Sequence, residues 1–208
     1  MARVDDYINA KALAAEALAG RPPDALSRES GYAPAGENAL RVPFLNRTFL
    51  VTVPGFAFTD EAAPEKPAPI QEEVLILHYL LGDPLAQPSA DWAAYREIPG
   101  AAFYFSAFVK RAVDPLKNVF GSDPAALKSV APMIGGAPFD GPGDAAIEFF
   151  PFPRVPVRMI LYAGDDEFPA EAAILFDRSA GRILSPEDLA WLSGMMVYRM
   201  AALAGQKK

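Results

Sequence analysis

Residues 147–176 read IEFFPFPRVPVRMILYAGDDEFPAEAAILF and contain three segments typical of β-strands. These segments, which are rich in β-branched, aromatic and long apolar side chains, are Ile147–Phe150, Val155–Tyr162 and Ala172–Phe176. The connections between them are too short for the crossover that parallel pairing needs. We therefore expect antiparallel strands in the C-terminal third of the chain. A helix should follow from Pro186, because Ser185 is a strong N-cap residue.

A second β-hairpin is expected between residues 40 and 53. Leu40, Val42 and Phe44 alternate with a basic residue and a proline, and an Asn-Arg pair at 46–47 offers a turn. Thr48–Val53 is again β-branched and aromatic. The period of two predicts two strands with one buried face.

Helical periodicity appears in several other places. Apolar residues recur at helical spacing from Tyr7 to Leu18, and Ile70–Leu81 is apolar on nearly every side after Glu73, which is typical of a buried helix. We expect another helix over 103–113 that Pro115 kinks or ends, and one more starting at Asp123. The stretch from residue 20 to 36 is expected to be irregular.

The fold class follows from the order of these elements. Helices and hairpins are segregated along the chain and no βαβ alternation is present, which indicates an α+β fold: an antiparallel sheet built from hairpins and packed with several helices. The chain has 208 residues, of which 21 are proline. We interpret residues 1–208 as a single domain, with a solvated proline-rich loop at about 60–69.

Composition excludes several kinds of chemistry. The chain has no cysteine, so it can form no disulfide, no cysteine-ligated zinc site and no iron–sulfur cluster of its own. Its one histidine is His78, so one chain cannot supply the two or three histidines of common catalytic metal sites. No nucleophile–base pair is recognisable, and we therefore favour a protein that is not an enzyme.

Charge and hydropathy limit the classes of partner that the protein can bind. Lys and Arg number 19 and Asp and Glu number 26, giving a net charge of −7, which argues against nucleic-acid binding. The apolar run Val74–Leu81 is too short to span a bilayer. The first residues carry no apolar run typical of a secretory signal. We expect no membrane partner and a cytoplasmic location.

Several short segments are similar to those of a known bacterial and archaeal family. The segments are Leu77–Leu81, Tyr95–Tyr104, Pro153–Val157, Gly164–Pro169 and Ile174–Asp177. Over roughly residues 70–192 the chain resembles the family called domain of unknown function 3786. Some members of that family carry an additional cysteine-rich iron–sulfur segment, of the kind also found in corrinoid iron–sulfur proteins. The resemblance thus implies anaerobic one-carbon or corrinoid metabolism, although this cysteine-free chain lacks that segment.

Five residues are candidates for contact with a cofactor: His78, Arg96, Tyr104, Arg154 and Arg158. His78 offers an axial ligand to a metal, including the metal of a tetrapyrrole, or a general base. The alternative is a largely buried core histidine, because the surrounding helix is apolar. Tyr104 belongs to an aromatic cluster that can stack on a planar ligand or fill the core.

The three arginines stand between apolar residues, where a buried guanidinium requires an anionic partner. That partner is either a protein carboxylate, Glu97 or Glu148, or an anionic group of a ligand.

Two functions follow from these observations. The first is a non-catalytic binding module for a cofactor-sized ligand, and a corrinoid or related tetrapyrrole is the best specific candidate. The alternative is a protein-interaction or assembly module that serves a separate iron–sulfur or redox protein and has no ligand of its own.

Overall fold

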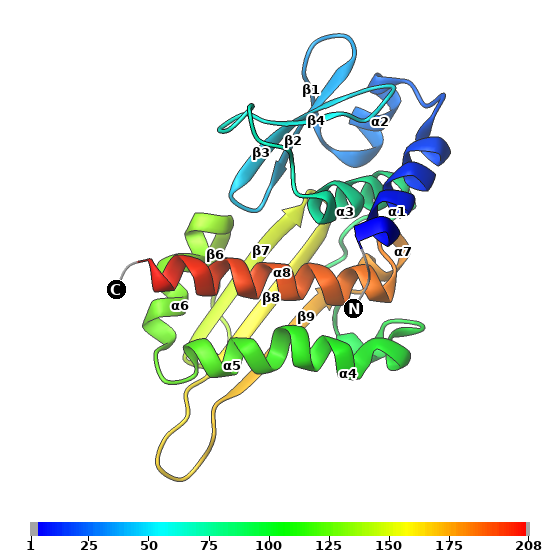
Figure 1. Cartoon of the computed structure of the whole chain (residues 1–208). Helices are drawn as coiled ribbons and strands as arrows, with labels where there is room; N and C mark the ends of the chain where they lie inside the picture. Colours follow the sequence, from blue (N-terminus) through cyan, green and yellow to red (C-terminus); the bar gives the residue numbers. More distant parts are fainter. Residues whose placement is uncertain (1–3, 207–208) are drawn as a thin grey trace. The chain divides into compact units, whose positions relative to one another are not determined.

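The structure, a computed structural model, describes residues 4–206 and confirms an α+β fold (Figure 1). The strands form two antiparallel sheets instead of one, with strand orders β1-β2-β3-β4 and β5-β9-β8-β7-β6. Backbone contacts group the chain into two compact units. The first unit comprises the described residues through Gln87 together with Phe152–Arg154 and Arg182–Leu184, and the second comprises the rest. The single-domain organisation over 1–208 stays a prediction.

The first unit contains the four-stranded sheet and three helices. Its elements are α1 (Val4–Leu18), α2 (Pro23–Ser30), β1 (Ala33–Pro34), β2 (Ala39–Phe44), β3 (Arg47–Thr52), β4 (Phe58–Asp60) and α3 (Ile70–Leu81). The expected hairpin is confirmed, because Leu40 pairs with Val51 and Phe44 with Arg47. As its period of two predicts, Leu40, Val42 and Phe44 are buried. No helix or strand lies between Glu61 and Pro69, in agreement with the expected proline-rich loop.

The helix α2 lies inside the stretch that was expected to be irregular. Pro23 occupies its first turn, where the missing N–H has no intrahelical partner to lose. Gly31 then ends the helix in the left-handed conformation, with φ of 80°. The expectation was wrong because a proline pair after a helix also suits the start of the next one.

The second unit contains the five-stranded sheet. Its regular elements are β5 (Trp92–Ala94), η1 (Tyr95–Glu97), η2 (Ala101–Tyr104), α4 (Phe105–Phe108), η3 (Val109–Val113), α5 (Asp114–Phe120), α6 (Pro124–Val130), η4 (Ala131–Ile134), β6 (Gly136–Pro138), β7 (Ala145–Phe152), β8 (Val155–Tyr162), β9 (Glu171–Asp177) and α8 (Pro186–Gly205). A short α7 (Ala180–Ile183), whose last two residues belong to the first unit, precedes α8. The three strands expected within 147–176 are confirmed as β7, β8 and β9, and Ser185 caps α8 as expected.

Pro115 does not end the helix that precedes it. The chain passes from α4 through a π-helical turn, η3, into α5, and Pro115 lies in the first turn of α5. The wider turn before the proline changes the local hydrogen-bond pattern where its N–H is missing, so the helical path continues.

Helices cover one face of the five-stranded sheet (Figure 1). The Phe176 ring of β9 lies 6.3 Å from the Phe108 ring of α4, so Phe176 marks the helix-covered face. Arg158 of β8 pairs with Leu175 on the opposite face, and both are only half-buried. The alternation along β8 and β9 thus separates a buried apolar face from one that carries a charged side chain. None of the described helices is long and apolar enough to cross a membrane.

Candidate functional site

The five predicted site residues are divided between the two units. His78 and Arg154 belong to the first unit, whereas Arg96, Tyr104 and Arg158 belong to the second. Only Arg154 is fully buried, with 6 % of its surface exposed. The contacts of each residue therefore decide which of them can contribute to a common site.

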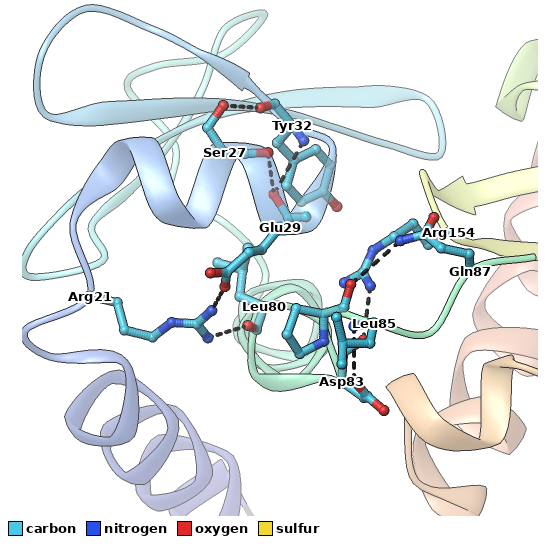
Figure 2. Close-up of polar contacts among 11 residues, drawn as sticks. Arg21, Ser27, Glu29, Tyr32, Leu80, Asp83, Leu85, Gln87 and Arg154 are labelled. Atoms are coloured by element: carbon cyan, nitrogen blue, oxygen red, sulfur yellow. Dashed lines mark hydrogen bonds and ion pairs between the residues drawn. The ribbon is translucent and has the colours of Figure 1, made fainter.

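Arg154 is held by three neutral oxygen atoms of the first unit. Its Nε donates to the Tyr79 hydroxyl at 3.3 Å, and its Nη1 donates to the main-chain carbonyls of Asp83 at 2.9 Å and Ala86 at 3.1 Å. Tyr79 lies on α3, and the two carbonyls belong to the turn that follows α3. Figure 2 shows Asp83 of this turn beside Arg154. The carboxyl end of a helix carries a partial negative charge, which favours a cation beside this turn.

No carboxylate forms an ion pair with Arg154 among the residues that the structure describes. The nearby Asp83 carboxylate is bound instead by Arg182. Hydrogen bonds from Leu85 and Arg182 lower the pKa of Asp83, and the charge of Arg154 adds a smaller effect in the same direction. The Nη2 group of Arg154 donates to no described atom, so its two N–H groups are available to an anion.

Tyr79, whose ring centroid lies 5.4 Å from the Arg154 guanidinium carbon, belongs to a cluster of aromatic rings. Tyr79 stacks on Phe152 with ring centroids 4.6 Å apart, and Phe152 contacts Phe44 at 5.1 Å. The Tyr32 ring meets Tyr79 edge-on at 5.4 Å. Burial raises the pKa of Tyr79, and the hydrogen bond and charge of Arg154 oppose this shift. The sequence carried no signal for Tyr32, because this residue lies in the stretch expected to be irregular.

His78 also lies on α3 but is half-buried, so the expected core position is only partly attained. Neighbouring positions along a helix differ by about 100°, which places His78 on a different side of α3 from Tyr79. Within residues 4–206, no group of three or more histidine, aspartate and glutamate side chains could hold a metal ion. A role for His78 as a metal ligand stays a prediction.

Arg96 and Tyr104 lie at the surface of the second unit. Arg96 is exposed and its guanidinium carbon stands 3.6 Å from the centroid of the Phe105 ring. The Tyr104 hydroxyl donates to the Glu187 carboxylate at 3.1 Å, and this hydrogen bond raises the pKa of Tyr104. Phe103, whose ring contacts the Tyr104 ring, is 85 % exposed. These side chains therefore do not form an interior site.

Arg158 is paired with a protein carboxylate. Its Nε donates to Glu148 at 2.8 Å, which is one of the two carboxylates that the sequence offered as a partner. The guanidinium carbon lies 4.0 Å from the Trp92 ring centroid and 4.2 Å from that of Phe139. The charge is neutralised by Glu148 and two aromatic rings contact the guanidinium, so Arg158 needs no ligand to explain its position.

An Arg158→Lys variant is expected to lose about 1 kcal/mol of unfolding free energy, because an ammonium group cannot stack between two rings and bind Glu148 in the same pose. Urea unfolding measures the change. Arg178→Lys is the matched control, because Arg178 forms an exposed ion pair with Asp91 at 2.8 Å and should change stability less. Equal stability of Arg158→Lys and the wild type would contradict the expectation.

Comparison with known proteins identifies a family without a described activity. No curated protein and no solved structure matches the chain. One family model matches residues 22–199, which include most of both units and extend beyond the segments that carried the resemblance in the sequence. The chain therefore belongs to the family described as Domain of unknown function (DUF3786).

Proposed function

We propose that this protein is a non-catalytic binding module for a cofactor-sized ligand that carries an anionic group. The observation that supports this function is Arg154, a buried guanidinium with no carboxylate partner among the described residues. Arginine stays charged at every physiological pH, and a buried charge is costly without an anion. An anionic ligand group would supply the missing counter-charge through Nη2.

A corrinoid or related tetrapyrrole is the specific candidate. Corrinoid and haem cofactors carry phosphate or carboxylate substituents, and Arg154 fits such a substituent. His78 belongs to the same unit but lies on a different side of α3 from Tyr79, so its role as an axial ligand is a separate prediction and the proposed anion contact does not depend on it. The proposed site does not include Arg96, Tyr104 or Arg158, because each already contacts a protein group of the second unit. The groups that touch Arg154 are a phenol and main-chain carbonyls, and none of them is a general base at neutral pH, which supports binding without catalysis.

Titration of the purified protein with hydroxocobalamin and with haem tests this proposal. We expect the visible absorbance of one of these compounds to shift on binding. We further expect Arg154→Met to weaken that binding at least tenfold, because it removes a charge-assisted hydrogen bond. Arg178→Met is the control, since Arg178 is an exposed arginine of the second unit. Near-ultraviolet circular dichroism verifies that both variants are folded. An unchanged spectrum with both compounds would reject a tetrapyrrole as the ligand.

The second candidate function is a protein-interaction or assembly module for a separate iron–sulfur or redox protein. It is favoured by Phe103, whose ring is 85 % exposed beside the half-buried Tyr104. Exposed aromatic side chains are frequent at protein interfaces. The absorbance titration separates the two functions, because an assembly module would change neither spectrum. The cytoplasmic location and the link to anaerobic metabolism stay predictions from the sequence.

A further inference from the structure

The Tyr32 hydroxyl is buried without a hydrogen-bond partner in the described chain. Only 2 % of this residue is exposed. Its main chain is fixed on both sides, because the Ser30 hydroxyl accepts from Tyr32 N at 3.2 Å and the Ser27 hydroxyl donates to Tyr32 O at 2.7 Å. The phenol points away from Ser27 (Figure 2). A buried hydroxyl is rarely left unpaired, so this group requires an explanation.

Tyr79 connects Tyr32 with Arg154. Its ring contacts the Tyr32 ring, and its hydroxyl donates to the main-chain carbonyl of Ser30 while accepting from Arg154 Nε. The Tyr79 hydroxyl thus donates one hydrogen bond and accepts another. In contrast, the Tyr32 hydroxyl and the Nη2 group of Arg154 donate to no described atom. Burial raises the pKa of Tyr32 well above its usual range, so the phenol remains a donor at neutral pH.

We propose that Tyr32 Oη and Arg154 Nη2 together bind an oxyanion, a carboxylate or phosphate oxygen of a small-molecule ligand. This inference rests on the proposed binding function and names the two side chains that recognise the anionic group of the ligand. Both side chains offer donors and neither offers a free carboxylate, so the pair selects an anion over a cation or a neutral amide nitrogen. Both side chains contact Tyr79, and the charge of Arg154 acts on the Tyr32 phenol, whose pKa it lowers against the larger effect of burial. The neutral phenol adds a directed hydrogen bond to the charge attraction of the guanidinium.

The experiment compares melting temperatures in sodium chloride, sodium acetate and sodium phosphate at one ionic strength and pH 7. Three chains are measured: wild type, Tyr32→Phe and Tyr95→Phe. Tyr95 is the matched control, because its hydroxyl is already bound to the Pro186 carbonyl at 2.7 Å in the second unit. General stabilisation by these salts affects all three chains alike and cancels in the comparison.

We expect phosphate or acetate to raise the melting temperature of the wild type above its value in chloride. Tyr32→Phe should melt at or above the wild-type temperature in chloride, because an unpaired hydroxyl is removed, and should bind the anion about tenfold more weakly. Tyr95→Phe should melt lower throughout but keep the wild-type response. If only phosphate raises the melting temperature, the ligand carries a phosphate group. If only acetate raises it, the ligand carries a carboxylate.

An equal anion response in wild type and Tyr32→Phe, or no response in either, would overturn the inference and leave Tyr32 bound to water at most. These outcomes are distinct from failure of the proposed function. If neither cobalamin nor haem changes its absorbance, but phosphate raises the melting temperature of the wild type more than that of Tyr32→Phe, the ligand is not a tetrapyrrole and the oxyanion site at Tyr32 and Arg154 is supported. If a tetrapyrrole binds the wild type and Tyr32→Phe with equal affinity, the binding function is supported and the oxyanion site at Tyr32 and Arg154 is rejected.

Discussion

Asp177→Ala is expected to lower the free energy of unfolding by about 4 kcal/mol, because it leaves three main-chain N–H groups without an acceptor. Asp177 is completely buried at the end of β9. One carboxylate oxygen accepts from Ser89 N at 2.9 Å and Ala90 N at 2.7 Å, and the other accepts from Ser179 N at 2.9 Å. These bonds also hold Ala90 in the left-handed region, with φ of 60°, which a non-glycine residue rarely adopts. Urea unfolding at pH 7 measures the loss.

Asp165→Ala is the matched control for this variant. The Asp165 carboxylate also accepts two main-chain bonds, from Glu167 N at 2.8 Å and Phe168 N at 2.7 Å, but it lies in an exposed turn. Water can accept these hydrogen bonds in place of the Asp165 carboxylate, so Asp165→Ala should lower the free energy of unfolding much less than Asp177→Ala. Similar losses in the two variants would show that burial of the Asp177 carboxylate adds nothing.

The contribution of the Asp177 carboxylate to the free energy of unfolding should also depend on pH. Burial raises the pKa of Asp177, but the hydrogen bonds from Ser179, Ser89 and Ala90 together lower it below its usual range. A carboxyl whose pKa is lower in the folded state stabilises the fold fully above its unfolded pKa of about 3.9. That stabilisation is lost as the pH falls through the folded pKa. The difference between wild type and Asp177→Ala should therefore be constant near neutrality and shrink below about pH 4.

Gly82→Ala is expected to cost about 3 kcal/mol, because the added methyl group meets main-chain atoms of Ile183. A Cβ at this position would lie 2.5 Å from the Ile183 carbonyl oxygen and 2.9 Å from its Cα. Rotation of a side chain cannot relieve these contacts, so one segment must move. The hydrogen bond from Asp83 N to Arg182 O, at 3.2 Å, would be stretched. Thermal and urea unfolding both report the loss.

The matched control is Gly205→Ala near the end of α8. No atom lies within 4 Å of a Cβ built at Gly205, and alanine favours a helix, so this variant should be as stable as the wild type or slightly more stable. The Gly82 backbone has φ of −58°, which alanine adopts freely, so steric contact alone is tested. A wild-type melting curve for Gly82→Ala would mean that the 182–184 segment adjusts without cost.

The elements that the sequence predicts correctly are those whose causes are local. The helix Ile70–Leu81 follows from continuous apolar residues bounded by Pro69 and Gly82, and α8 follows from the cap at Ser185. The strands β7, β8 and β9 follow from apolar runs separated by short turns. Where one local signal has two structural meanings, as for Pro23, the expectation was wrong. The assignment of α2 needs the packing of that segment against β2 and against α3, and α3 lies far along the chain.

The partners of the candidate residues were decided only by tertiary structure. Nothing near Arg154 in the sequence marks its acceptors, which lie 68 to 75 positions away on Tyr79, Asp83 and Ala86. The Glu148 partner of Arg158 was among the local choices, because a hairpin brings β7 and β8 together, but the Trp92 and Phe139 rings were not. A guanidinium has the same charge in every sequence context. Whether that charge is neutralised, stacked or left available to a ligand depends on which distant segments the fold places around it.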